Sequence, residues 1–213
     1  MNKQTGFTLI ELAIVLVIIG LLLGGVLRGQ ELINSARVKN LTRDFQNVQV
    51  YIYGYQDRFH AIPGDDATAT AHVAASANGN GNGQIAGQWN SAAAGDESHL
   101  FWEGVRLAGL APGSTNPADL QFQPRNSNGG LLGVQSIAAG FNKINNLTGQ
   151  FAICSDAILG RDAVQIDQTI DDGETSTGTV RAIATANSGN ADTTATLSTP
   201  AGASAAYTVC MTI

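Results

Sequence analysis

The chain has 213 residues, of which 44% are hydrophobic and only 13% are charged, and its formal net charge is −6. Because nucleic-acid-binding proteins usually present a basic face, this acidic balance argues against a nucleic-acid partner. Outside the apolar N-terminal stretch, roughly 180 residues remain, which is enough for one domain with a buried core. The 25 glycines, with many Asn, Ser, Thr and Ala residues, indicate a loop-rich exterior rather than a helical bundle.

The N-terminal stretch from Phe7 to Leu27 is almost wholly apolar and carries one carboxylate, Glu11. As a helix it would span roughly 30 Å, the thickness of the hydrocarbon core of a bilayer. A cleavable secretory signal would need a shorter apolar core with a small-residue cleavage site directly after it. A carboxylate inside a spanning helix is costly, so Glu11 either snorkels to the nearby interface or has a cationic partner in another chain.

The apolar stretch leads into an amphipathic pattern instead of a cleavage site. Apolar residues recur there at alternating spacings of 3 and 4, which is one stripe of a helix. The stripe consists of Val38, Leu41, Phe45, Val48, Ile52, Tyr55 and Phe59. Pro63 and Gly64 end the pattern. We therefore predict one helix from about residue 7 to about residue 60, whose first half suits lipid and whose second half suits packing on a sheet.

The letters "GFTLIEL" at residues 6–12 resemble the processing site of type IV prepilins and of type II secretion pseudopilins. The resemblance implies that a prepilin peptidase removes a short leader carrying Lys3 by cutting after Gly6. It also implies that the same enzyme methylates the new N-terminal amine of Phe7. In that family a glutamate at the position of Glu11 pairs with the N-terminal amine of a neighbouring subunit during filament assembly.

The same resemblance implies an α+β pilin fold, in which a long N-terminal helix packs on a small antiparallel sheet. The expected organisation is a leader at 1–6, a transmembrane and assembly half of the helix at 7–34, and a globular domain at 35–213 that includes the amphipathic half. The implied partners are copies of the chain, the prepilin peptidase, an inner-membrane assembly platform and, before assembly, the inner membrane. The globular domain would lie in the periplasm first, and then in an extracellular or periplasmic filament of a bacterium.

Looser similarity to a branch of the same superfamily continues through "RFHAIPGDDATA", "NGNGNGQI", "FWEGVRLAGLAPG" and "IDQTIDDGETSTGTVRA". Residues 63–95 are rich in Gly, Asn and Ala, and we expect loops there. A short helix should follow, capped by Asp96 or Ser98 and ended by Gly109 and Pro112. Its apolar side would consist of Leu100, Phe101, Val105 and Leu107.

The C-terminal half of the chain has the patterns of an antiparallel sheet. Alternating and β-branched residues predict strands near 131–138, 150–155, 178–185 and 206–213. A short helix ending in an Asp-Gly turn is expected between the second and third of these strands.

The two cysteines, Cys154 and Cys210, occupy two of these strands. In each strand the cysteine alternates with larger apolar residues, so both cysteines should lie on the face away from those side chains. Neighbouring strands would bring them within bridging range, and thiols that reach a periplasm are oxidised. We expect a Cys154–Cys210 disulfide, with two buried free thiols as the alternative.

Two groups of oxygen-bearing side chains are candidate calcium ligands. Asn78, Asn80 and Asn82 precede a glycine and an apolar residue, which is the order at the start of a calcium-binding loop. Because these amides are neutral, a flexible polar turn is the favoured interpretation and calcium binding is the alternative. The second group is acidic and consists of Asp167, Asp171, Asp172 and Glu174. A solvated Asp-Gly turn is the favoured interpretation of this group, with calcium binding as the alternative. We therefore expect that no cofactor is required and that calcium is an optional one.

Other polar and aromatic residues show no catalytic pattern. The histidines lack metal-ligand spacing, and we expect them at the surface or at helix caps: His60, His72 and His99. Trp89, Phe101 and Trp102 are expected in the core. Hydrolase, phosphate-loop and dinucleotide motifs are missing from the sequence, which disfavours an enzyme. The leading hypothesis is a structural pilin, with a type II secretion pseudopilin and a non-polymerising membrane-anchored binding protein as alternatives.

Overall fold

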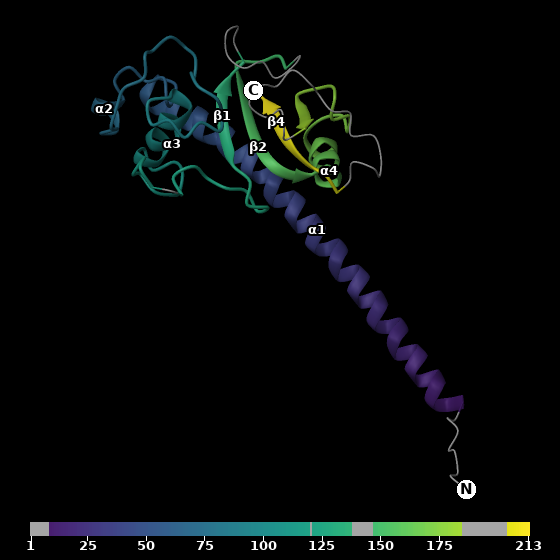
Figure 1. Cartoon of the computed structure of the whole chain (residues 1–213). Coiled ribbons are helices and arrows are strands. Elements are labelled where there is room, and N and C mark those ends of the chain that lie inside the picture. The colour runs from purple at the N-terminus through teal and green to yellow at the C-terminus, as the bar shows by residue number, and fades with distance from the viewer. Residues whose placement is uncertain (1–8, 120, 138–146, 185–203) are drawn as a thin grey trace. The chain divides into compact units, whose positions relative to one another are not determined.

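The computed structural model describes residues 9–119, 121–137, 147–184 and 204–213. Its longest element is helix α1 (Leu9–Phe59), which runs without a break from the apolar stretch through the amphipathic one (Figure 1). The long helix expected from the sequence is thus confirmed. The chain divides into two compact units, Met1–Arg37 and Val38–Ile213, so α1 contributes to both.

The second unit contains the remaining elements of the described chain. The helices are α2 (Ala69–His72), α3 (Glu97–Leu107) and α4 (Gly160–Ile170). The strands are β1 (Leu132–Ser136), β2 (Phe151–Leu159), β3 (Val180–Ala184) and β4 (Ala206–Thr212). All four expected strands and both expected short helices are present. The sequence did not predict α2, which has only four residues, or the full length of β2, which extends to Leu159.

The four strands form one antiparallel sheet in the order β1-β2-β4-β3. The C-terminal strand β4 therefore lies inside the sheet, between β2 and β3. Its register with β2 places Ile153 opposite Met211 and Cys154 opposite Cys210. A long N-terminal helix on a small antiparallel sheet is the α+β arrangement of the pilin fold, which confirms the expected fold class.

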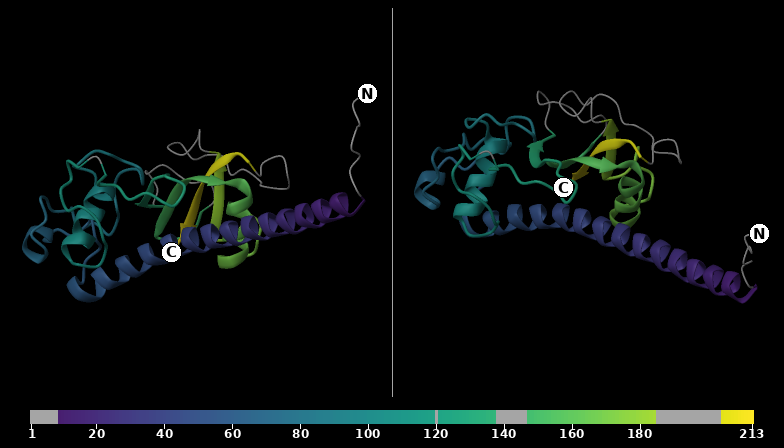
Figure 2. Two further views of the ribbon diagram at one scale, coloured as in Figure 1. Left: turned by 90° about the horizontal axis from the view of Figure 1, so that it is seen from below. Right: turned by 60° about the horizontal axis from the view of Figure 1, so that its bottom comes forward.

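One face of the sheet packs against the C-terminal part of α1, as both views in Figure 2 show. The predicted stripe supplies the helical side of this core, with six fully buried residues and Phe59 half-buried at its end. The sheet side is formed by Val134, Phe151, Ile153, Val209 and Met211. Burying one such side chain contributes roughly 1.5–3 kcal/mol, so the stripe is what fixes α1 to the sheet.

The opposite face of the sheet is buried as well. A second apolar cluster covers it and consists of Trp89, Leu147, Ala152, Cys154, Ile183 and Cys210. Trp89, Phe101 and Trp102 all lie in the core, with exposed fractions of 2% or less, as expected. Both cysteines belong to the second cluster, so they do lie on the face away from Phe151, Ile153, Val209 and Met211.

Helix α3 differs from its expectation in two respects. Asp96 occupies the N-cap position but makes no side-chain cap hydrogen bond. Its carboxylate instead accepts a hydrogen bond from the hydroxyl of Ser91. The Ser98 hydroxyl donates to the carbonyl oxygen of Gln88. The predicted cap is therefore wrong, because loop residues take both side chains. The helix is also buried on nearly every side, polar residues included, although it ends before Gly109 as predicted.

Candidate functional site

The N-terminal part of α1 is an apolar surface whose described side chains are exposed. Among the described residues, α1 is long and apolar enough to cross a membrane, judged by length and composition. Its most apolar 18-residue window has a mean hydropathy of 2.8, and none of that window is buried. Individual side chains are largely open, such as Leu9 at 88% and Leu21 at 73% exposure. A continuous apolar surface of this size marks contact with lipid or with other protein.

Glu11 lies in the first turn of this apolar helix, in an exposed position. A carboxylate is favoured there by the positive end of the helix dipole. The next charged residue along the chain is Arg28, which forms an exposed ion pair with Glu31 at 3.4 Å. Glu11 is therefore the one charge on a long apolar surface. The expected cleavage and methylation residues, Gly6 and Phe7, lie outside the described residues.

The expected Cys154–Cys210 disulfide is present in the structure. Its two residues are direct partners in the β2–β4 ladder, with their Cα atoms 4.1 Å apart. Both side chains are fully buried. The bond thus fastens the C-terminal strand to β2 in the middle of the sheet.

The asparagine-rich loop is built around a carboxylate of the chain itself. Backbone N–H groups of Gly81, Asn82 and Gly83 donate to the carboxylate of Asp65 at 2.7, 3.1 and 2.7 Å. Asp65 is almost fully buried. Successive N–H groups that point inward form a concavity that suits an anion, and here the anion is Asp65. Sequence reasoning missed this role, because the partners are 16 to 18 residues apart.

The three amides proposed as calcium ligands have other hydrogen bonds in this loop. The side-chain oxygen of Asn78 accepts the N–H of Thr70, and those of Asn80 and Asn82 each accept an N–H two residues later. Such bonds hold the turns of the loop in place. Calcium binding by these three amides stays a prediction.

Asp66, next to Asp65, joins α1 to the loop that contains α2. Its carboxylate accepts the Tyr55 hydroxyl at 2.8 Å, and it lies 2.7 Å from Nδ1 of His72. It also accepts the N–H and the hydroxyl of Thr68. Burial acts to raise the pKa of Asp66, but the hydrogen bonds from His72, Thr68 and Tyr55 lower that pKa below its usual value. The ionised carboxylate is therefore part of the folded structure.

Three of the four acids expected at the end of α4 converge. One carboxylate oxygen from each of Asp167, Asp171 and Asp172 lies within 4.8 Å of the others. Asp167 is fully buried, and its Oδ1 accepts the N–H of Gly173 at 3.1 Å. Burial, with the charges of Asp172, Asp171 and Glu174, raises the pKa of Asp167 to about 6 despite that hydrogen bond. The side chains have the oxygen chemistry that hard divalent cations prefer.

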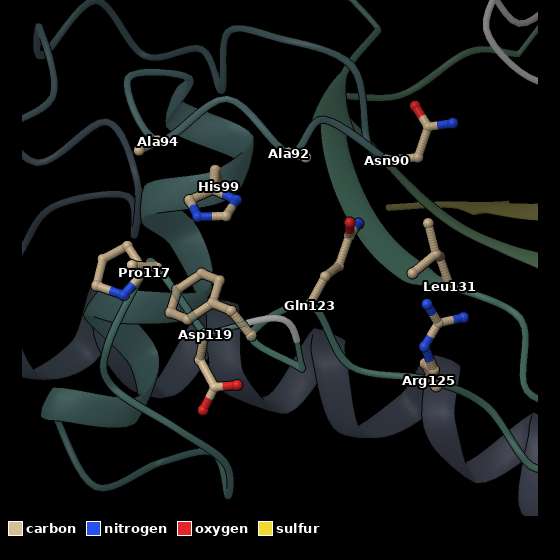
Figure 3. Close-up of a pocket in the computed structure, with 11 residues that line it drawn as sticks. Asn90, Ala92, Ala94, His99, Pro117, Asp119, Gln123, Arg125 and Leu131 are labelled. Carbon is tan, nitrogen blue, oxygen red and sulfur yellow. The ribbon is translucent and has the colours of Figure 1, made fainter.

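His99 corrects one expectation, because it is buried and not at the surface. Its ring packs on Phe122, with the ring centres 4.4 Å apart. It also lines a hollow of about 500 Å³. Figure 3 shows His99 and Pro117 on one side of this hollow and Arg125 and Leu131 on the other. His99 is buried because it belongs to the part of α3 that is buried on nearly every side, and because its ring packs on Phe122. His60 and His72 are exposed, as expected.

Comparison with known proteins gives one finding that bears on the apolar helix. Residues 1–27 match the family model described as "Prokaryotic N-terminal methylation motif". This motif is the prepilin-type signature of type IV pilins and pseudopilins, so the resemblance seen in "GFTLIEL" is confirmed for this part of the chain. No curated protein and no solved structure matches the chain. The motif and the apolar helix together fit membrane anchoring.

Proposed function

We propose that this chain is a structural subunit that polymerises through its N-terminal helix into a type IV pilus-like filament. The observation that carries the proposal is the exposed apolar half of α1, which directly follows the processing motif and carries Glu11 in its first turn. Before assembly, the helix would anchor the chain in the inner membrane, with the globular domain in the periplasm. A prepilin peptidase would cut after Gly6 and methylate Phe7.

In this proposal, assembly changes what covers the apolar surface of α1. In the membrane, lipid covers that surface, and in a filament the helices of neighbouring copies would cover it instead. Both environments are apolar, so the apolar area that is buried is similar in the two. The packing of the helices and the pairing of their polar groups therefore decide whether a helix leaves the membrane for the filament. Glu11, the one charged residue between Phe7 and Leu27, is then the natural determinant of register.

Glu11 would supply that register by pairing with the N-terminal amine of another subunit. After cleavage, the amine begins the chain at Phe7, four residues before Glu11. A carboxylate inside a bundle of apolar helices is strongly unfavourable without a cation, and the amine of a neighbour offers one. The pair therefore favours one stagger between adjacent helices over others.

Two alternatives share the same motif. A type II secretion pseudopilin would use the same helix to form a shorter filament in the periplasm, and the genes that flank this one would separate the two systems. A plain membrane anchor that carries a binding domain would use only the lipid-facing property of α1. Such an anchor has no need for Glu11, which makes this residue the discriminating one.

The experiment is Glu11→Ala in the bacterium that makes the protein. We expect the variant to reach the membrane and to be cut before Phe7, as mass spectrometry of its N-terminal peptide would show. Its amount in sheared or pelleted filaments should fall at least roughly tenfold, since losing a buried pair costs more than about 1.4 kcal/mol.

The matched control is Glu31→Ala, in the same helix. Glu31 makes only an exposed pair with Arg28, which contributes little to stability. We expect this control to assemble like the unmodified protein. Equal filament yields for Glu11→Ala and Glu31→Ala would contradict the assembly role and favour the plain anchor.

A further inference from the structure

The C-terminal end of α4 carries an unusual concentration of negative charge. The carbonyl groups at a helix C-terminus already give that end a partial negative charge, and cations are favoured there. In α4 the last turn has no basic residue, and the chain continues through Asp171, Asp172 and Glu174. Repulsion among these groups makes the arrangement unfavourable in itself, and cations are favoured beside it. The basic residue by this turn is Arg181, whose Nε donates to the carbonyl oxygen of Gly178 at 3.2 Å.

Asp167 adds a buried carboxylate to this negatively charged group. It is 0% exposed, and its Oδ2 atom is buried without a hydrogen-bond partner. Leaving a buried carboxylate oxygen unpaired costs free energy, and natural structures rarely tolerate it without a ligand or a functional reason. A carboxylate oxygen from each of Asp171 and Asp172 lies within 4.8 Å of one from Asp167. The buried acid thus faces a small group of further acids.

The loop after α4 holds these acids in place. The carboxylate of Asp171 accepts the N–H of Thr179 and that of Val180, at the start of β3. That of Asp172 accepts the N–H of Glu174 and the hydroxyl of Thr177. The positive φ angle of Gly178, +70°, and its close approach to Asp171 leave no room for a side chain there. The acids are therefore pre-positioned by backbone contacts, as the ligands of an ion site need to be.

We propose that Asp167, Asp171 and Asp172 bind a calcium ion at the C-terminal end of α4. Three carboxylates with no cysteine or histidine among them suit a hard cation and disfavour zinc or copper. Calcium tolerates irregular coordination and accepts water as a ligand, whereas magnesium demands a strict octahedron. Asp172 is exposed, so water can reach the ion and complete its shell.

The ion would connect the end of α4 to the beginning of β3. Asp167 belongs to α4, and Asp171 is bonded to the backbone of Val180 in β3. Calcium would neutralise the buried Asp167 and stiffen the turn between the two elements. This site does not depend on filament assembly, because all its residues belong to one globular unit.

The test measures thermal unfolding of the full-length chain in detergent, after chelation and then with added calcium chloride. Unfolding can be followed by the fluorescence of Trp89 and Trp102, which are both buried. We expect calcium to raise Tm by roughly 5–10 °C at a hundredfold excess over its dissociation constant. Magnesium chloride at the same concentrations should give a clearly smaller shift.

Asp167→Asn is the decisive variant, since asparagine keeps the shape and can still accept the N–H of Gly173. Without calcium we expect its Tm to equal or exceed that of the unmodified chain, because a buried charge is gone. Its calcium response should be lost. A purely structural role for Asp167 predicts the opposite, namely a lower Tm without calcium and no calcium response in either protein.

Two further variants keep the test decisive. Asp172→Asn changes an exposed ligand and should weaken calcium binding about tenfold while leaving the fold intact. Asp57→Asn removes an exposed acid from α1 and should respond to calcium like the unmodified chain. Absence of any calcium-dependent shift up to about 10 mM would overturn the proposal, because extracellular calcium sites bind in the range of about 0.1–1 mM. A full response in both Asp167→Asn and Asp172→Asn would overturn it equally.

Discussion

Asp65 and Asp66 are neighbours in the sequence, yet each organises a different part of the globular unit. Asp65 gathers the N–H groups of residues 81–83, and Asp66 joins Tyr55 of α1 to His72 and Thr68. Both carboxylates are buried, and both oxygens of each have hydrogen-bond partners. Hydrogen bonds to a charged group are stronger than those between neutral groups. These two residues therefore hold the loops in place in a region with little regular secondary structure.

Asp65→Ala should unfold the asparagine-rich loop. The change removes three hydrogen bonds to a carboxylate. Gly81 would keep its bond to the backbone oxygen of Asp65, and Asn82 would keep its bond to Oδ1 of Asn80. We expect the loss to lower the free energy of unfolding by roughly 2–4 kcal/mol. Chemical denaturation measures the loss, and limited proteolysis should cut between residues 76 and 95. Asn82→Ala in the same loop removes a single local bond to Gln84 and should cost about 1 kcal/mol or less. Equal effects of the two variants would refute the role given to Asp65.

Asp66→Asn should destabilise the protein in a pH-dependent way. The folded pKa of Asp66 lies below its unfolded value. Its contribution is therefore present above the unfolded pKa, near 3.9, and is lost as pH falls through the folded pKa. We expect a loss of roughly 1–3 kcal/mol at pH 7 that shrinks as pH falls below about 4. A loss that stays constant between pH 7 and pH 3 would show that the charge of Asp66 is irrelevant. Asp57→Asn serves again as the exposed control.

At the scale of elements, periodicity in the sequence was sufficient for the long helix and the sheet. The stripe from Val38 to Phe59 and the alternation in β4 reflect burial against one large partner, which local spacing records directly. The strand order was not predictable, because it places the C-terminal strand between β2 and β3. The covering of α3 was missed for the same reason, since loop residues distant in sequence bury its polar residues.

The disulfide acts on the sheet as a whole. Because β4 is an inner strand, its bond to β2 restrains the centre of the sheet, and the two cysteines are 56 residues apart. Loop-closure entropy alone assigns such a bond about 4 kcal/mol. Replacing both Cys154 and Cys210 by alanine should therefore lower Tm by about 10 °C and make β4 more labile to protease. Unchanged Tm and unchanged cleavage near the C-terminus would contradict this role.

For the whole molecule, the two units have opposite solvent requirements. The unit Val38–Ile213 has its own core on both faces of a sheet, whereas Met1–Arg37 exposes apolar side chains along α1. The change of character along α1 can be seen in the sequence, because an apolar run with a single charge, Glu11, is followed by an amphipathic stripe in the same helix. The carboxylates of the candidate sites were harder to interpret. Only folding shows that Asp65 is enclosed by N–H groups while Asp167 is left with an unpaired oxygen.

The polymerisation proposal is tested most directly by an electron cryo-microscopy map of filaments purified from cells that produce this chain. The proposal predicts that the apolar half of α1 forms the dry centre of the filament. Glu11 should lie within about 4 Å of the methylated amine of Phe7 from a neighbouring subunit. A map in which Glu11 faces solvent, or in which α1 lies outside the filament centre, would contradict the account.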